Sequence, residues 1–383
     1  MSHMMPYEQP FTQQHSAMSH AIPYENLKRL NHPFEEQFKQ QLAHVLEKGW
    51  YILGEEVTHF EQEFADYHGS AYAVGVANGL DALILSLQCC GFEKGSEVIV
   101  PSNTYIATIL SIIHCGLVPV LAEPSIRTYN IDPAAIAPLI TPKTVAIMVV
   151  HLYGQCCNMG PVMDIATQHG LKVIEDCAQA HGARYKQQLA GTFGDFGAFS
   201  FYPTKNLGAL GDAGAIICKS KTDYLKLRQL RNYGSEKKYH NGVIGYNSRL
   251  DELQAAFLRI KLPALNSINE HKRKLADIYA AGLNDQFMKP VVDPDYFHVY
   301  HIYNVLHPKR DELKKYLADH HIATDIHYPV APHDQPALKG YLRHYHYPIA
   351  TQIHQQTLSL PCSVIHTEAE IHQVVAVMNQ FPG

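Results

Sequence analysis

Short apolar runs alternate with helical patterns through the first half of the chain. The runs 71–76, 97–100, 118–121, 145–150 and 171–174 each predict a strand, and helix-compatible stretches separate them. Strands that are apolar on both faces and alternate with helices form parallel sheets with helices on both sides. We therefore expect an α/β fold with a mostly parallel central sheet. Such sheets bind ligands at the carboxyl ends of their strands.

Helical patterns precede and follow the first of these strands. Residues 22–68 carry apolar side chains at helical spacing, namely Phe34, Phe38, Leu42, Val45 and Leu46. After the strand, Asn78 stands before a second apolar helix with Asp81 three residues on, which predicts an N-cap. Gly91 predicts the end of that helix.

The pattern of residue types along the chain changes in its last third. A long helical stretch from Asp251 passes Pro263, which should kink or break it, and leads into a region rich in His and Tyr. We predict a large domain over 21–262 and a smaller α+β C-terminal domain over 263–383. Residues 1–20 are polar and lack periodicity, so we expect a flexible extension.

Composition narrows the class of protein. The chain has 383 residues, 46% of them hydrophobic, enough for a large core. Its formal net charge of −5, with no basic run, argues against a nucleic-acid partner. No apolar stretch is long enough for a membrane span, and no signal pattern opens the chain. The 8 cysteines form no CxxC pair, so we expect reduced thiols in the cytoplasm.

Histidine is unusually abundant, with 25 residues. One interpretation is a metal-binding module, in which His320, His321, His344 and His346 gather on one surface. No HExxH motif or paired Cys supports a defined site, so a solvated surface cluster is favoured and we predict no metal.

Two segments place polar groups at the predicted strand ends. Asn78-Gly79-Leu80 opens a helix after a strand, where free N–H groups and the helix dipole suit a phosphate, although turn glycines before helices are common. The segment 171–182 delivers Glu175 and Asp176, followed by Gln179 and His181. The alternative for Asp176 is a helix cap.

Two further segments add a lysine and a polar loop. Lys205 lies in a turn behind Phe199, Phe201 and Tyr202. Apolar surroundings disfavour its ammonium form and produce a nucleophilic amine able to form a Schiff base, whereas the alternative is an exposed surface lysine. The segment 245–252, Gly-Tyr-Asn-Ser-Arg-Leu-Asp-Glu, is a polar loop before a helix.

The order of these four motifs resembles the pyridoxal-phosphate-dependent nucleotide-sugar aminotransferases of the DegT/StrS family. The resemblance runs from Ile22-Pro23-Tyr24 to Leu358-Ser359-Leu360-Pro361, nearly the whole chain. It implies the aspartate aminotransferase fold, fold type I, with pyridoxal 5′-phosphate as cofactor. It also implies a homodimer with shared active sites.

The resemblance assigns roles to the central residues. Lys205 would form a Schiff base with the cofactor and later shuttle a proton. Asp176 would pair with the pyridinium nitrogen, which makes the ring an electron sink. Gln179 would hydrogen-bond the ring hydroxyl, and Tyr105 would stack on the ring face.

The phosphate contacts are also implied. The phosphate would rest on the N–H groups of Gly79 and Leu80, on Ser200, and on Asn247 of the partner subunit. Many relatives have Ser-Gly-Thr at 78–80, so a hydroxyl contact is absent here and backbone amides take a larger share.

The implied substrates are L-glutamate as amino donor and a keto sugar on a nucleoside diphosphate as acceptor. The segments 231–240 and 323–330 are similar to members that aminate C3 of dTDP-3-keto-6-deoxyhexoses, in routes to deoxy amino sugars for O-antigen or other glycans. The candidate substrate contacts are His181, Lys237, Lys238, Tyr239, His240, His327 and His333. The alternative for Lys237 and Lys238 is a solvated loop pair, and for His327 a structural histidine.

Other functions stay open. The alternative reaction is amination at C4 of a UDP-, GDP- or dTDP-linked 4-keto sugar. Relatives that dehydrate the sugar commonly have His in place of the lysine, so Lys205 favours transamination. A non-catalytic regulator that keeps the fold is disfavoured by the intact Lys205, Asp176 and Gln179.

Overall fold

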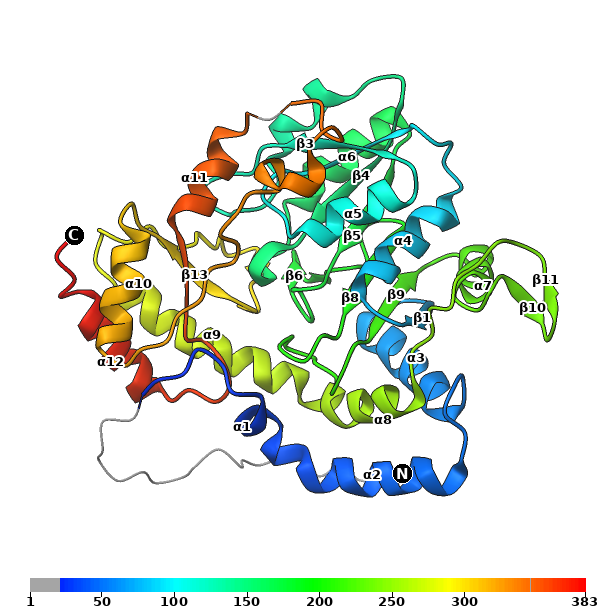
Figure 1. Ribbon diagram of the computed structural model, residues 1–383, viewed down its shortest axis with the longest axis horizontal. Coiled ribbons are helices and arrows are strands. Elements are labelled where there is room, and N and C mark those ends of the chain that lie inside the picture. Colours follow the sequence, from blue (N-terminus) through cyan, green and yellow to red (C-terminus); the bar gives the residue numbers. More distant parts are fainter. Residues whose placement is uncertain (1–20, 345) are drawn as a thin grey trace.

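A seven-stranded sheet lies at the centre of the molecule (Figure 1), in a computed structural model that describes residues 21–344 and 346–383. The strand order is β1-β9-β8-β5-β4-β2-β3, and only β9 runs antiparallel to its neighbours. The strands are β1 Tyr72–Val76, β2 Glu97–Pro101, β3 Val118–Ala122, β4 Thr144–Val150, β5 Lys172–Asp176, β8 Phe196–Ser200 and β9 Gly214–Cys218. The predicted α/β fold with a mostly parallel sheet is confirmed.

The five predicted strands correspond to β1 to β5, with ends shifted by one or two residues. Strands β8 and β9 were not predicted from the sequence. Strand β8 carries Gly197 among aromatic residues, which is the composition of a turn, yet the glycine has a packing reason. A Cβ at Gly197 would lie 2.5 Å from the backbone of Gly191.

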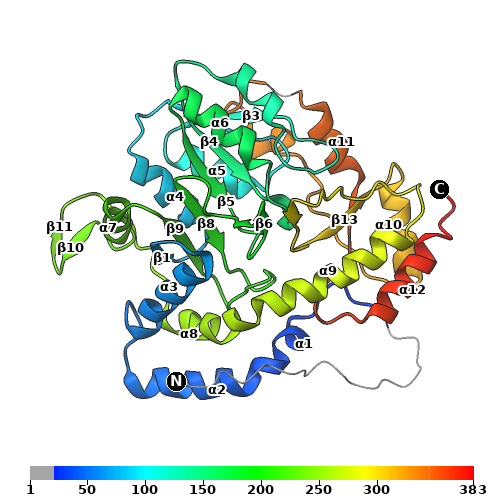
Figure 2. The same ribbon diagram turned by 180° about the vertical axis from the view of Figure 1, so that it is seen from behind.

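Helices cover both faces of the sheet, as Figures 1 and 2 show. One apolar cluster, on the first face, includes Phe60 and Phe64, Val162 and Leu258. A second cluster, on the other face, includes Leu85, Ile109 and Leu227. The helices that supply them are α3 Glu55–His68, α6 Met159–His169 and α8 Glu252–Lys261 for the first, and α4 Gly79–Cys90, α5 Ile106–His114 and α7 Lys221–Leu230 for the second.

The predicted helical region 22–68 is helical over most of its length, in several segments rather than one. It comprises α1 Leu27–Asn31, a 3₁₀ turn His32–Phe34, α2 Glu35–Lys48 and α3. Gly49, at φ 63°, ends α2 in the left-handed conformation that glycine adopts readily. Of the predicted apolar positions, Leu42 and Leu46 are exposed, whereas Phe34, Phe38 and Val45 are buried.

The predicted helix boundaries at Asn78, Gly91 and Pro263 are confirmed. Asn78 Oδ1 accepts a hydrogen bond of 2.8 Å from the N–H of Asp81 at the start of α4, and Gly91 follows the helix at φ 71°. Pro263 lies in a 3₁₀ turn, Leu262–Ala264, between α8 and α9 Leu265–Gly282.

The rest of the chain forms a second core beside the sheet. Its apolar cluster combines Ile22 with side chains between Leu275 and Phe381. This region holds α10 Arg310–Asp319, α11 Pro348–Gln356, α12 Glu368–Met378 and the antiparallel pair β13 Tyr303–Leu306 and β14 Thr357–Leu360. The division at residue 262 stays a prediction, and the predicted extension over residues 1–20 lies outside the described residues.

Two small β-structures complete the fold. Strands β6 Arg184–Tyr185, β7 Gln188–Leu189 and β12 Tyr296–Phe297 form a short sheet. The hairpin β10 Ser235–Lys237 and β11 His240–Asn241 projects beyond α7 (Figure 1). Within the described ranges, no helix combines the length and apolar character needed to cross a membrane. All eight cysteines are free.

Candidate active site at the carboxyl ends of the strands

Asp176 is the last residue of β5, in the middle of the sheet. Its carboxylate accepts hydrogen bonds from Thr108 Oγ1 at 2.8 Å and from the Ala178 N–H at 3.1 Å. Burial raises the pKa of Asp176, while these hydrogen bonds and the charge of Lys205 oppose the rise. The residues that follow form turns, so the alternative that Asp176 caps a helix is wrong.

Glu175, the neighbouring carboxylate, points to the other side of β5 and has a different environment. It accepts hydrogen bonds from the N–H groups of Gly191, Phe193 and Gly194, each at 2.8 Å, and lies 2.9 Å from His151 Nε2. Atoms that could bind a metal lie within 4.8 Å of one another in Glu175, His151 and Cys177. The carboxylate oxygens of Glu175 are, however, already occupied by these hydrogen bonds. Glu175 therefore anchors the end of β5.

Lys205 lies in the loop after β8. Its backbone N–H donates a hydrogen bond to the carbonyl of Tyr202 at 2.8 Å. Burial lowers the pKa of Lys205 to about 8, and the carboxylate of Asp176 opposes this effect. The alternative of an exposed surface lysine is therefore wrong. The Nζ atom lies 3.4 Å from His301 Nε2, so the amine has a partner from a distant segment.

Gln179 and Tyr105 lie on either side of a tyrosine that the sequence analysis did not select. Gln179 Oε1 accepts from the Tyr153 N–H at 2.6 Å, and its Nε2 donates to Tyr328 Oη at 2.9 Å. The ring centres of Tyr105 and Tyr328 are 4.9 Å apart, and Tyr105 is 52% exposed. Tyr105 is thus an open aromatic face at the strand ends.

Gly79, Leu80 and Ser200 come together where α4 begins. A Cβ at Gly79 would lie 2.5 Å from Ser200 Cβ, so only glycine lets the helix approach the end of β8 this closely. The N–H groups of Gly79 and Leu80 belong to the first helical turn and have no carbonyl partner within the helix. This end of α4 suits an anion.

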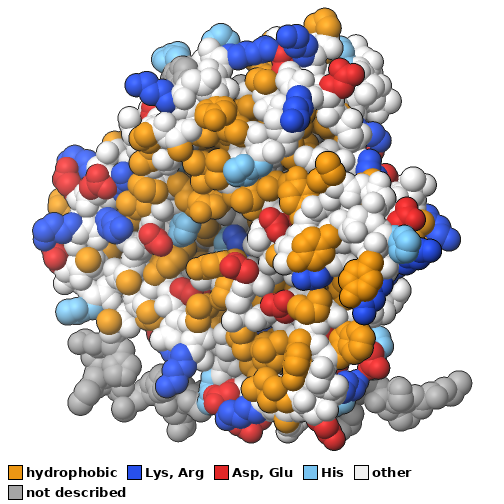
Figure 3. All heavy atoms as spheres, turned by 45° about the vertical axis from the view of Figure 1, so that its right-hand side comes forward, with side chains coloured by type: hydrophobic (Ala, Val, Ile, Leu, Met, Phe, Trp, Pro, Cys, Tyr) orange, Lys and Arg blue, Asp and Glu red, His pale blue; other side chains and the backbone are white. Residues whose placement is uncertain are grey.

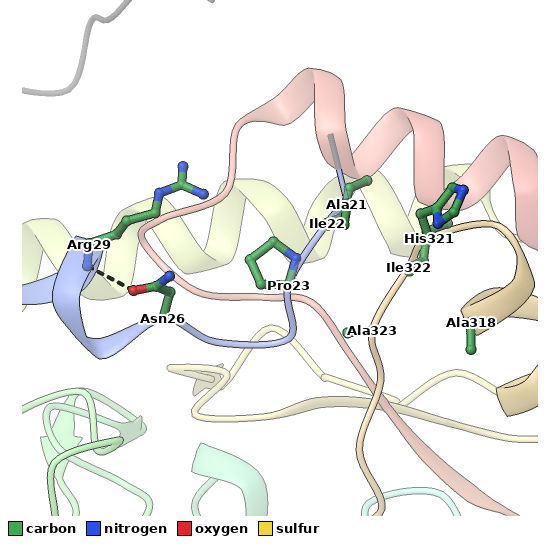
Figure 4. Close-up of a pocket in the computed structure, with 9 residues that line it drawn as sticks. All are labelled: Ala21, Ile22, Pro23, Asn26, Arg29, Ala318, His321, Ile322 and Ala323. Atoms are coloured by element: carbon green, nitrogen blue, oxygen red, sulfur yellow. Dashed lines mark hydrogen bonds between the residues drawn. The ribbon is translucent and has the colours of Figure 1, made fainter. Parts of the chain in front are cut away.

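The N-terminal segment brings a further pair to the site. Ile22 pairs with Ile322 in a short parallel bridge. The N–H of Ile22 donates to the carbonyl of His321, and its carbonyl accepts from the N–H of Ala323, each at 2.9 Å. Figure 4 shows these two segments side by side. This pairing places the Tyr24 ring centre 5.8 Å from that of His327.

His327 has a neutral ring near neutral pH. Burial lowers the pKa of His327 to about 4, Lys205 adds to this effect, and Asp325 opposes it. Its Nδ1 lies 2.9 Å from Ser359 Oγ. His327 is thus within electrostatic range of Lys205 and also has a structural hydrogen bond.

Two other predicted substrate contacts are buried. His181 has no exposed surface and packs 5.6 Å from the ring centres of both Phe199 and Phe201. His333 lies 3.0 Å from Thr351 Oγ1 and packs on Tyr347. Both act in packing, and their burial offers no surface to a substrate.

The hairpin and Asn247 are not brought to the lysine of the same chain. Lys237, Lys238, Tyr239 and His240 lie at the exposed tip of β10 and β11, and Asn247 is exposed beside them in sequence. Among the described residues, no group of metal-binding size includes His320, His321, His344 or His346.

Several site residues had no recognisable sequence signal. Thr108 lies inside an apolar helix, and His301 in the His- and Tyr-rich region where single histidines are common. Tyr328 lies within the motif 323–330, which could have identified it. All three reach Asp176, Lys205 or Gln179 only through tertiary contacts.

The central sheet, its two helical layers and this residue set define the class: a fold type I transferase of the aspartate aminotransferase type. A buried carboxylate, an amine with a lowered pKa and a first-turn anion cradle fit pyridoxal phosphate. The chain belongs to the DegT/DnrJ/EryC1/StrS aminotransferase family, whose sequence profile matches residues 33–379. It is an aminotransferase.

Individual relatives cover almost the whole chain. The chain is 49% identical over 361 residues, 94% of its length and 99% of the relative's, to a dTDP-3-amino-3,6-dideoxy-α-D-galactopyranose transaminase of Aneurinibacillus thermoaerophilus. It is 43% identical over 89% of its length, and 90% of the relative's, to a dTDP-3-amino-3,4,6-trideoxy-α-D-glucose transaminase of Streptomyces venezuelae. The crystal structure of DesV from S. venezuelae with a ketimine intermediate superposes with a TM-score of 0.92 at 41% identity, covering 94% of this chain and 98% of that one.

Proposed function

We propose that the protein transfers an amino group from L-glutamate to C3 of a dTDP-linked 3-keto-6-deoxyhexose, giving a dTDP-3-amino-3,6-dideoxyhexose. The observation that carries this proposal is the 49% identity, over 94% of the chain, to a transaminase named for such a product. The strand-end set of Lys205, Asp176 and Gln179 supports the chemistry. The product would serve deoxy amino sugar biosynthesis for O-antigen or another glycan.

Pyridoxal phosphate, when bound, stores the amino group between the two half-reactions. Lys205 would attach the cofactor and, when released, move a proton through its amine. Asp176 would hold its carboxylate against the ring nitrogen, and the cost of burying that charge, visible in its raised pKa, falls when a cation lies beside it.

The other contacts would orient the cofactor. Tyr105 would cover a ring face, and Gln179 would direct an amide hydrogen to the ring hydroxyl. Gly79, Leu80 and Ser200 would hold the phosphate, and Asn78 would cap α4, with its side-chain oxygen accepting from the Asp81 N–H.

We also propose a homodimer in which each subunit completes the other's site. The support is an exposed apolar surface: Ile244 is 96% exposed and Tyr239 86% exposed, and Figure 3 shows apolar side chains gathered on that side of the molecule. Exposed apolar surface of this kind is typical of an interface. Asn247 would then reach the phosphate in the partner's site, and Lys237, Lys238 and His240 would reach the sugar-nucleotide diphosphate there.

His327 is the histidine of the same chain that best suits the sugar, because it is within electrostatic range of Lys205 and is partly exposed. Tyr239 would pack on the sugar or base from the partner. A cytoplasmic location is part of the proposal and is supported by eight free cysteines, which persist in reducing compartments.

The reverse reaction tests the substrate. Purified protein with pyridoxal phosphate and 2-oxoglutarate is given dTDP-linked 3-amino-3,6-dideoxygalactose, its glucose epimer, or a 4-amino-4,6-dideoxy sugar, and glutamate formation is measured. We expect glutamate from a 3-amino sugar. Preference for the 4-amino sugar would establish the C4 alternative, and no glutamate from any of them would contradict the proposal.

A further inference from the structure

His301 lies between two lysines. Its Nε2 is 3.4 Å from Nζ of Lys205, and its backbone carbonyl accepts from Nζ of Lys272 at 3.4 Å. Lys272, on α9, is buried, with 5% of its surface exposed. Helix α9 thus holds the backbone of His301, while the imidazole of the same residue contacts Lys205.

The backbone around His301 is fixed to that same loop. Asn206, the residue after Lys205, donates from Nδ2 to Val299 O at 2.9 Å. The Val299 N–H donates to Gly154 O at 3.0 Å. Gly154 has a φ of 106°, and a Cβ there would lie 3.0 Å from the backbone nitrogen of His301. This close approach therefore requires glycine. The distance between His301 and Lys205 is therefore set by packing on both sides.

The imidazole of His301 is neutral. Burial lowers its pKa well below the ordinary value, and Lys205, Lys272, His327 and His181 add to this effect. Both neighbouring histidines are themselves neutral near neutral pH, since burial lowers the pKa of His181 to about 3 and that of His327 to about 4. Among the residues that the structure describes, Asp176 is the one carboxylate that acts on Lys205, and it favours the ammonium.

The position of the single proton follows from the unpaired nitrogen. His301 Nδ1 is buried and has no hydrogen-bond partner among the described residues. A buried N–H without an acceptor is rarer and costlier than a buried lone pair without a donor. The proton is therefore on Nε2, the nitrogen that faces Lys205.

We propose that His301 is a positioning residue for Lys205, whose Nε2–H donates to the lone pair of the lysine amine and favours its neutral, nucleophilic form. Lys272 keeps the imidazole from taking a second proton. The catalytic meaning of this contact rests on the proposed function, but the contact itself is a property of the folded chain.

The test measures the pKa of Lys205 in the full-length protein stripped of cofactor. Acetylation of Lys205 by acetic anhydride is followed by mass spectrometry as a function of pH, with exposed lysine peptides as internal reference. In His301→Leu the amine loses its donor, so we expect the pKa of Lys205 to rise by about one unit. His301→Gln keeps an amide donor, and we expect less than about half of that rise.

His372→Leu, an exposed histidine on α12, is the control and should leave the pKa of Lys205 unchanged. Thermal unfolding followed by circular dichroism shows whether each variant is folded, and His301→Gln serves as the second variant if His301→Leu does not fold. An unchanged or lowered pKa in His301→Leu would overturn the proposal. Because this readout needs no substrate or cofactor, it can fail while the proposed transamination holds, and the reverse.

Discussion

The residues that the family resemblance assigns to the site lie in two regions, and these regions differ in how far they are exposed to solvent. The strand-end region around Asp176 and Lys205 is buried and hydrogen-bonded, with altered pKa values for both groups. The hairpin region, with Tyr239 and Asn247, is exposed and carries an open apolar surface. One chain thus brings the strand-end groups together by itself, whereas in the proposed dimer the hairpin region would act on the partner's site.

The largest expected effect comes from removing the amine of the strand-end region. Lys205→Ala should abolish the absorption band of bound cofactor and lower amino transfer by more than roughly a thousandfold, because no other group replaces a lost nucleophile. The matched control is Lys261→Met. Lys261 is also buried, with a pKa lowered to about 8, but it bonds Gly208 O at 2.7 Å and lies outside the proposed set. Loss of the band in the control alone would contradict the assignment.

The next largest effect is a pH dependence of the same region. Capture of pyridoxal phosphate needs the neutral amine of Lys205, and burial lowers its pKa to about 8. The neutral fraction, and with it the capture rate, should rise roughly fiftyfold from about pH 6 to about pH 8 and then level off. Stopped-flow absorbance measures this rate. A rate that keeps rising toward pH 10, as for an exposed lysine, would refute the lowered pKa.

The third prediction joins the two regions across subunits. Lys205→Ala and Asn247→Asp chains should each be nearly inactive alone, the second because a carboxylate repels the phosphate. In a mixed dimer one of the two sites combines Lys205 from one chain with Asn247 from the other. Random mixing should therefore restore about a quarter of the wild-type activity.

Mixing under conditions where subunits do not exchange is the control for that experiment. If subunits exchange and activity does not return, the two residues act within one chain and the shared site is refuted.

The smallest effect concerns assembly through the hairpin region. Ile244→Asp places a charge on the most exposed apolar side chain of that surface, and we expect dimer dissociation at concentrations about tenfold higher than for wild type. Analytical ultracentrifugation measures the dissociation constant. Met288→Asp, at an exposed position after α9, is the matched control. Equal dissociation constants for Ile244→Asp and wild type would place the interface elsewhere.

Local patterns were enough to predict much of the strand-end region. Apolar runs identified five strands, and the motif after β5 placed Asp176 and Gln179 at a carboxyl end. Lys205 was identified by the aromatic residues that precede it in the sequence, and burial does lower the pKa of its amine. Strand β8 was missed because its glycine serves a close backbone contact with Gly191, a reason that no local pattern contains.

Periodicity and capping act over a few positions along the chain, so the sequence alone was enough to predict five of the seven strands, the helices between them and the residues that end those strands. Only the tertiary structure decided that Thr108 and His301 reach Asp176 and Lys205, that His181 is enclosed in the core, and that Asn247 is left outside. Burial and contact between distant segments depend on how the whole chain packs. The amine of Lys205 owes its lowered pKa to that packing.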